Sequence, residues 1–315
     1  MCRLSTVDHF LKTGRRTLCH CRYMWNGVIS RAELEQAGLN GHRIAGLQAK
    51  GELVHVSRGW YAQKDASPLI KLVAMCHTRL GCLSACQFHD LWVPPEKDKT
   101  IHLVANSWES AGKIAGKIHN VTNGRIQPVI HREYGVKTEL VVDVKRAVEQ
   151  VARFHSPEEA LIVIESALNL GKMSVSDVEC MLKTIPKSRA RCLRKFQTTS
   201  QSGSETRVAH FLRSRGLKVV QQFSPIPGWF VDMLVGNSWI LECDSAAHHA
   251  GKEAFARDRQ RDLLLKEMGF DVTRLSYWQI WEDWENTKNA LIRILRRRNY
   301  RHWPEPLWEE PSQAG

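Results

Sequence analysis

The sequence has no apolar run long enough to cross a lipid bilayer, and its first residues, MCRLSTVDHFLKTGRR, lack the apolar core of a secretory signal. These two absences predict a cytoplasmic protein without a membrane partner. Acidic residues are also scarce, because 33 Asp and Glu stand against 45 Lys and Arg, for a formal net charge of +12. Such an excess of positive charge favours a polyanionic partner, and nucleic acid is the leading class.

The chain also lacks paired C-x2-C motifs, although it contains nine cysteines. An odd number of cysteines without a secretory signal predicts reduced thiols rather than a disulfide scaffold. Two groups of candidate ligands, neither with the spacing of a structural zinc site, are Cys19, His20 and Cys21, and Cys76, His77, Cys82, Cys86 and His89. The second group lies in a stretch whose periodicity favours one buried helix, where cysteine behaves as a small hydrophobic residue.

Residues 30–63 follow the pattern of two short helices and a small hairpin. Ser30 and Glu33 have the spacing of a capping box, and Asn40 can cap the second helix. A Ser-Arg-Gly turn at 57–59 then separates two short strands. Helix, tight turn, helix and hairpin is the order of a winged helix-turn-helix.

The stretch GVISRAELEQAGLNGHRIAGLQAKGELVHVSRGWYA resembles the N-terminal domain of AbiEi-type antitoxins and related transcriptional regulators. In that family the second helix and the wing contact DNA. The resemblance implies that Arg43, Gln48 and Lys50 on the second helix and Arg58 in the wing bind DNA. The alternative interpretation is that these residues are only solvated polar positions, which every surface helix needs.

The middle of the chain, residues 67–182, alternates short apolar runs with helical stretches and contains no convincing nucleophile–base pair. Ser156 and Pro157 form a good helix start. Between Lys183 and Lys218 ten Lys or Arg accompany one acid, so we interpret residues 183–201 as a basic linker beside the DNA backbone. Four histidines, interpreted as surface or core residues, are His89, His102, His119 and His131.

The most informative pattern is a hairpin that carries three acids. With a three-residue loop at 236–238, Asp232 lies directly opposite Glu242. Asp244 follows two residues later and therefore points to the same side of the strand as Glu242. Carboxylates buried this close together need a neutralising cation, and a hard divalent ion suits an all-oxygen cluster.

The ordered segments SGSETRVAHFLRSRG, WFVDMLVG and ILECDSAAHHAGKEAFARDRQRDLLLKEMGFDVTRLSYWQI resemble the PD-(D/E)XK nuclease superfamily. Within it, they are most similar to domains like the very-short-patch-repair endonuclease. The resemblance implies Mg²⁺, or Mn²⁺, bound by Glu205, Asp232, Glu242 and the backbone carbonyl of Cys243. Such an ion polarises the scissile phosphate and lowers the pKa of an attacking water.

One position departs from the superfamily pattern, because Asp244 stands where the usual lysine would be. The resemblance then makes His249 the catalytic candidate for proton transfer or for orienting the water, with its neighbour His248 as an alternative. In the D-R-x-R-D pattern at 258–262, we expect ion pairs that support the site and phosphate contact by Arg259 or Arg261.

Two further groups lie after residue 276. Tryptophans spaced by three are interpreted as core packing on one helical face: Trp278, Trp281 and Trp284. Arginines near the C-terminus, expected to contact phosphate, are Arg293, Arg296, Arg297, Arg298 and Arg301.

The sequence therefore predicts a multidomain α/β protein. Its expected parts are a winged helix-turn-helix at 1–66, an α/β middle region at 67–182, a basic linker at 183–201, a restriction-endonuclease-like domain with a central mixed sheet flanked by helices at 202–301, and a tail at 302–315. The predicted function is a DNA-binding, Mg²⁺-dependent endonuclease. The alternative is a non-catalytic regulator of antitoxin or repressor type with a degenerate nuclease domain. A homodimer and a partner of toxin–antitoxin or phage-defence type stay open.

Overall fold

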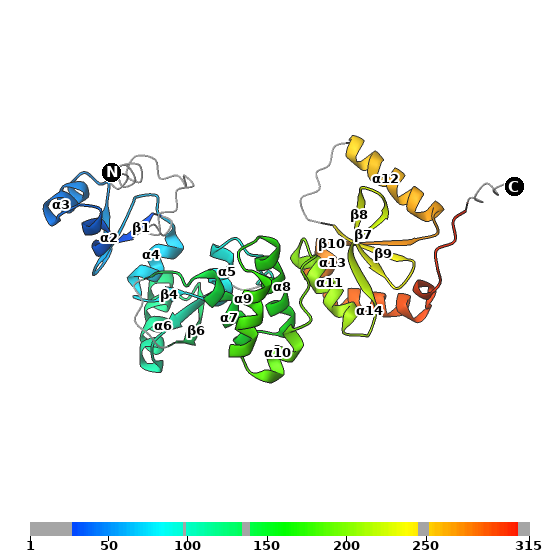
Figure 1. The fold of residues 1–315 in the computed structure, drawn as a ribbon. Coiled ribbons are helices and arrows are strands. Elements are labelled where there is room, and N and C mark those ends of the chain that lie inside the picture. The colour runs from blue at the N-terminus through cyan, green and yellow to red at the C-terminus, as the bar shows by residue number, and fades with distance from the viewer. Residues whose placement is uncertain (1–26, 97–98, 134–138, 245–251, 308–315) are drawn as a thin grey trace. The chain divides into compact units, whose positions relative to one another are not determined.

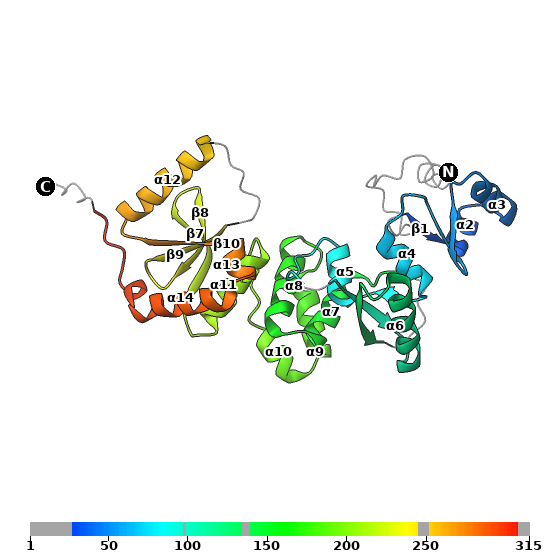
Figure 2. The same ribbon diagram turned by 180° about the vertical axis from the view of Figure 1, so that it is seen from behind.

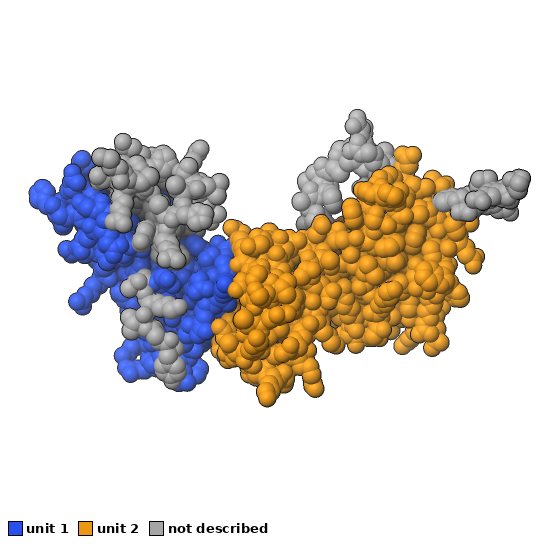
Figure 3. All heavy atoms as spheres, viewed as in Figure 1, with its two compact units in different colours: residues 1–89, 96–147 blue, residues 90–95, 148–315 orange. Residues whose placement is uncertain are grey.

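A computed structural model describes residues 27–96, 99–133, 139–244 and 252–307, and the side chains of 252–258 lie outside the description (Figure 1). The chain forms two compact units (Figure 3). Unit 1 comprises residues 1–89 and 96–147, and unit 2 comprises residues 90–95 and 148–315. Among the helices of the described ranges, none combines the length and apolar character needed to cross a membrane.

Unit 1 begins with two helices on a small antiparallel sheet of order β1-β3-β2. Its elements are β1 (Val28–Ser30), α2 (Arg31–Gln36), α3 (Gly41–Ala49), β2 (Val54–Ser57) and β3 (Trp60–Ala62). The capping box of Ser30 with Glu33 is confirmed, and Asn40 accepts a hydrogen bond from the backbone N–H of Arg43. Strand β1 was not predicted. The core of this part is Leu34, Ile44, Leu53 and Tyr61 with Ile29.

The rest of unit 1 is a three-stranded sheet of order β4-β5-β6 with three helices. Its elements are α4 (Pro68–Met75), β4 (Arg79–Leu80), α5 (Cys82–Phe88), β5 (Thr100–Ala105), α6 (Trp108–Thr122) and β6 (Gln127–Arg132). The prediction of one helix through the cysteine-rich stretch is wrong. His77 adopts a positive φ of 51°, which ends the first helical segment, and Arg79 then pairs with Val104 of β5. The thiols of Cys76, Cys82 and Cys86 are buried, as expected.

Helix α7 (Val144–Phe154) contains the boundary between the units, and unit 2 continues with α8 (Pro157–Asn169), α9 (Val175–Thr184) and α10 (Lys187–Leu193). Ser156 caps α8 as predicted, with Glu159 completing a capping box. The stretch 183–201, predicted as a linker, contains the helix α10. Its Ala190 and Leu193 are buried, because apolar residues three apart give even a basic segment one packing face.

The C-terminal half of unit 2 is a mixed four-stranded sheet of order β10-β9-β8-β7. Only β10 and β9 are parallel to each other in this sheet. Helix α12 covers one face, and α11 and α14 cover the other (Figures 1 and 2). The elements are α11 (Gly203–Arg213), β7 (Val219–Ile226), β8 (Trp229–Val235), β9 (Trp239–Asp244), α12 (Lys252–Glu267), β10 (Asp271–Ser276), α13 (Tyr277–Trp281), α14 (Trp284–Arg296) and a 3-10 turn (Asn299–Arg301).

The three tryptophans do not share one helical face, because the helix breaks between α13 and α14. Trp284 is buried and packs edge-on against Phe211, whereas Trp278 is 59% exposed. The guanidinium of Arg207 lies 4.7 Å from the ring centre of Trp281 and 5.0 Å from that of Trp284. The core-packing interpretation therefore holds for Trp281 and Trp284 and is wrong for Trp278.

Candidate active site

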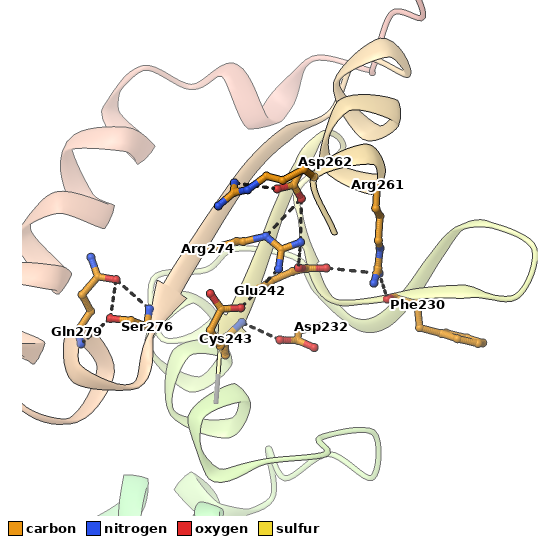
Figure 4. Close-up of polar contacts among 11 residues, drawn as sticks. Phe230, Asp232, Glu242, Cys243, Arg261, Asp262, Arg274, Ser276 and Gln279 are labelled. Carbon is orange, nitrogen blue, oxygen red and sulfur yellow. Dashed lines mark hydrogen bonds and ion pairs between the residues drawn. The ribbon is translucent and has the colours of Figure 1, made fainter. Parts of the chain in front are cut away.

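The site is built on the hairpin of β8 and β9, and its register is the predicted one. Met233 pairs with Leu241 and Val235 with Trp239, so the loop is 236–238 as predicted, and the paired ladder ends one residue before Asp232 and Glu242. The carboxylate of Asp232 accepts a 2.7 Å hydrogen bond from the backbone N–H of Cys243 (Figure 4). This bond fixes the Asp232 side chain against β9.

Glu205 reaches the same region from the first turn of α11. It is buried, and its Oε2 accepts hydrogen bonds from the backbone N–H of Gln201 at 2.9 Å and from the side-chain amide of Gln222 at 3.1 Å. Gln222 adopts a φ of 51°, which non-glycine residues rarely have. Because the β7–β8 register continues through this position, Gln222 lies opposite Asp232 and joins Glu205 to the hairpin.

Glu242 is buried between two arginines. Its Oε2 lies 2.9 Å from Nη2 of Arg274 on β10, and its Oε1 lies 3.4 Å from Nη2 of Arg261 on α12 (Figure 4). Arg261 also donates to the carbonyl oxygen of Phe230. Glu242 is therefore held in place by charge from both neighbouring elements.

Arg274 connects three carboxylates. Besides Glu242, its guanidinium lies 2.8 Å from Oδ1 of Asp262 and 3.5 Å from Oδ1 of Asp244. Arg259 lies 3.5 Å from the other oxygen of Asp262, and its side chain is 64% exposed. The predicted support of the site by ion pairs from the D-R-x-R-D segment is thus present for Arg259, Arg261 and Asp262.

Negative charge remains in excess around Asp232. Burial, together with the nearby Glu205 and Asp244 carboxylates, raises its pKa to about 6, although the N–H of Cys243 and the charge of Arg261 oppose the shift. Burial likewise raises the pKa of Glu205. The pKa of Glu242 is raised by burial, although Arg274 and Arg261 oppose the shift. An added positive charge would lower the pKa of all three carboxylates.

The donor set fits a hard divalent cation, because it consists of oxygens and includes the half-buried Asp232, whose pKa stays raised. Glu205, Asp232, Glu242 and the carbonyl of Cys243 would hold it. Within the described ranges, no three of these carboxylates bring their oxygens within 4.8 Å of one another. Binding of the ion would therefore require side chains to move. Glu242 would have to exchange its ion pairs with Arg274 and Arg261 for a bond to the metal.

The remaining site predictions have different outcomes. His248 and His249 lie outside the described residues. Arg296 and Arg297 are exposed on and beside the end of α14, and Arg297 shares a hollow with Trp239 and Asp271, the first residues of β9 and β10. At the rise of an extended strand, Glu242 and Asp244 lie about 10 and 16 Å further along β9 than Trp239. The structure does not bring these two arginines to the acids.

The predicted DNA-contact residues of unit 1 lie on its surface. Arg43 and Lys50 are exposed on and directly after α3, Gln48 is half-buried, and Arg58 is exposed in the turn between β2 and β3. Ile44 of the same helix lies in the core.

Two functional residues were missed by sequence reasoning, namely Arg274 and Gln222. Arg274 lies in a strand of mixed polarity, DVTRLS at 271–276, so the sequence offered little signal, and only the parallel pairing shows that it lies beside Glu242. The sequence carries no comparable signal for Gln222, because a single glutamine in a strand is unremarkable.

Comparison with known families bears on this part of the chain. A family model described as REase_MTES_1575, a restriction endonuclease-like family, matches residues 205–295. The match supports a nuclease domain here. It begins at Glu205 and includes Asp232, Glu242, Asp244 and Arg274, so the acids and the arginine that joins them lie within the matched segment. None of the curated proteins compared with the chain matches it.

Proposed function

We propose that the protein is a Mg²⁺- or Mn²⁺-dependent DNA endonuclease, with a nuclease domain like the very-short-patch-repair endonuclease and an AbiEi-like winged helix that targets it to DNA. One observation carries the proposal: the half-buried Asp232 interacts electrostatically with Glu205, Glu242 and Asp244 within the segment matched by the nuclease family. The excess of negative charge suits a divalent cation facing a phosphate.

A bound divalent ion supplies Lewis-acid activation of water and charge neutralisation at the scissile phosphate. The chain's own residues orient the reactants. The N–H of Cys243 holds Asp232, and Arg274 and Arg261 hold Glu242. Asp244, 39% exposed, replaces the superfamily's lysine and is not a cation. The proton transfer from water is therefore assigned to His249, in the segment that follows β9.

The winged helix is proposed from the elements of unit 1. Two capped helices precede the β2–β3 hairpin, and Arg43, Lys50 and Arg58 are exposed on the second helix and the turn. This arrangement offers positive charge to the DNA backbone while Ile44 anchors α3 to the core.

Plasmid cleavage with the purified protein in Mg²⁺ tests the proposal. Wild type should nick or linearise the plasmid, and chelation with EDTA should stop it. Asp232→Ala and Glu242→Ala should lose activity by ~100-fold or more if electrostatic and metal stabilisation dominate. The matched control is Glu285→Ala, whose side chain is 83% exposed on α14 and forms an ion pair with Lys288. Equal cleavage by wild type and both site variants would contradict the site.

A second candidate function is a non-catalytic DNA-binding regulator. One observation favours it, namely that Glu242 is neutralised by two arginines rather than held open for a metal. The regulator predicts sequence-specific binding through unit 1, no cleavage of any DNA, and binding that Asp232→Ala leaves unchanged.

A further inference from the structure

A second cluster of metal-binding side chains lies in unit 1, far along the chain from the acids. The Sγ of Cys82 and ring nitrogens of His102 and His131 lie within 4.8 Å of one another. They come from three elements, the first residue of α5 and the strands β5 and β6. Sequence spacing gave no indication of the cluster, because strand pairing brings its members together.

The backbone is arranged to place Cys82 beside His102. The N–H of Gly81 donates to the carbonyl of His102 at 3.0 Å, and the N–H of His102 donates to Oγ of Ser84 at 2.9 Å. Cys82 itself adopts a φ of 50°, a conformation that non-glycine residues keep only where the surroundings enforce it. The turn at Cys82, held by these hydrogen bonds to β5, therefore places the thiol beside His102.

The two histidines stand at the same face of the sheet. In the parallel register of β5 and β6, His102 pairs with Val129, so His131 is two residues further along on the same side. Their rings stack at an interplanar angle of 10°. Nδ1 of His102 lies 3.4 Å from Nε2 of His131. Two imidazole nitrogens on one tetrahedral zinc, each at 2.0–2.1 Å from the ion, are also separated by about 3.4 Å.

Glu96 supplies the outer contact that metal-bound histidines usually have. Its Oε1 lies 2.8 Å from Nε2 of His102, the ring nitrogen that faces away from His131. A carboxylate on the far nitrogen fixes the tautomer in which the nitrogen near His131 carries a lone pair. His102 is therefore set to donate that lone pair to a cation.

We propose that unit 1 contains a structural zinc site in which Cys82, His102 and His131 bind the ion and Glu96 orients His102. One thiolate and two imidazoles suit a borderline dication such as Zn²⁺. They supply three of the four ligands of a tetrahedral ion. The role is structural because Cys82 is fully buried and His102 is 3% exposed, so a substrate has no access to them. The ion fixes the start of α5 to the β5–β6 sheet.

Metal analysis of the full-length protein, purified without chelator, tests the proposal. Wild type should contain zinc in stoichiometric amount. Replacement by Co²⁺ should give a thiolate-to-cobalt charge-transfer band and the intense visible bands of tetrahedral cobalt. Cys82→Ala should lose the charge-transfer band and most of the zinc. The control Cys86→Ala removes an equally buried thiol one helical turn away and should keep both. Zinc-free wild type that takes up no cobalt, or a band that persists in Cys82→Ala, overturns the site.

A milder variant keeps the test decisive if Cys82→Ala fails to fold. Glu96→Gln leaves all three ligands in place and should weaken zinc affinity by roughly 10- to 100-fold in competition with a chelator. Unchanged affinity in Glu96→Gln, like zinc-free wild type, contradicts the proposal. Asp232→Ala should retain the zinc, so loss of plasmid cleavage and loss of zinc are separate outcomes.

Discussion

Arg274 of β10 lies opposite Glu242 of β9 in the parallel register, and its Nη2 is 2.9 Å from Glu242 Oε2. The same guanidinium reaches Asp262 on α12 and Asp244 at the end of β9. The guanidinium of Arg274, on the strand beside the hairpin, thus forms ion pairs with three carboxylates. Its ion pair makes Glu242 rigid rather than free.

Arg274→Gln should destabilise the protein, because Glu242 and Asp262 lose their shared counter-charge while staying partly buried. Removing one partner of a fully buried pair costs 3–5 kcal/mol. The Arg274 side chain is 24% exposed, so solvent screening reduces the expected loss to about 2–3 kcal/mol. Denaturant unfolding at neutral pH measures this. Arg296→Gln, an exposed arginine on α14, should change the free energy of unfolding by less than about 0.5 kcal/mol. Equal effects of the two variants would contradict the network.

Asp232 should make the stability of the metal-free protein fall as pH rises. Its folded pKa of about 6 lies above the ordinary value of 3.8, so the folded state holds a proton that the unfolded state has lost between these values. The free energy of unfolding therefore decreases from about pH 4 to pH 7, and the loss is complete above the folded pKa.

Asp232→Asn removes this titration while its amide oxygen can still accept from Cys243. In EDTA the variant should be more stable than wild type by about 1–3 kcal/mol at pH 7 and equal to it near pH 4. Added Mg²⁺ should raise the melting temperature of wild type more than that of the variant. Unfolding curves from pH 4 to 8 measure both effects, and parallel pH profiles would show that Asp232 is not the group responsible.

Helix caps and the hairpin loop, which depend on residues close together in the sequence, were predicted correctly. Ser30, Asn40 and Ser156 cap the helices assigned to them, and the three-residue loop at 236–238 fixes the register that pairs Met233 with Leu241. Features that depend on non-local pairing were missed. Arg274 becomes a site residue only through the parallel strand pair.

Two of the errors have a local cause that periodicity does not reveal. His77 and Asp283 interrupt expected helices, and neither position is marked by glycine or proline. The boundary expected at residue 202 was placed by composition. The structure shows that the helices before it share buried polar contacts with α11.

Glu165 should be essential for the contact between α8 and α11. It is 3% exposed on α8 and accepts hydrogen bonds from Ser200 Oγ at 2.6 Å, Thr206 Oγ1 at 2.7 Å and the backbone N–H of Gln197 at 2.9 Å. Glu165→Ala removes the carboxylate that accepts from two buried hydroxyls and one half-buried N–H, and should cost about 2–4 kcal/mol in unfolding experiments. Glu179→Ala, an exposed acid on α9, is the control and should have little effect.

A fragment that starts at residue 202 should aggregate, because it lacks Glu165 and the helices that pack against α11. A fragment that starts at residue 148, the first residue of the continuous part of unit 2, should fold.

Arg43 and Lys50 should govern the salt dependence of DNA binding if unit 1 docks through α3. Each phosphate contact that is removed lowers the slope of log K against log salt by about 1, so Arg43→Ala with Lys50→Ala should lower it by about 2. Titrations of labelled duplex at several salt concentrations give the slope. Arg31→Ala is the matched control, because Arg31 is an exposed arginine on the neighbouring helix α2 whose Nε lies 2.8 Å from Glu35. An equal change of slope for Arg31→Ala would show that net charge, rather than docking of α3, drives binding.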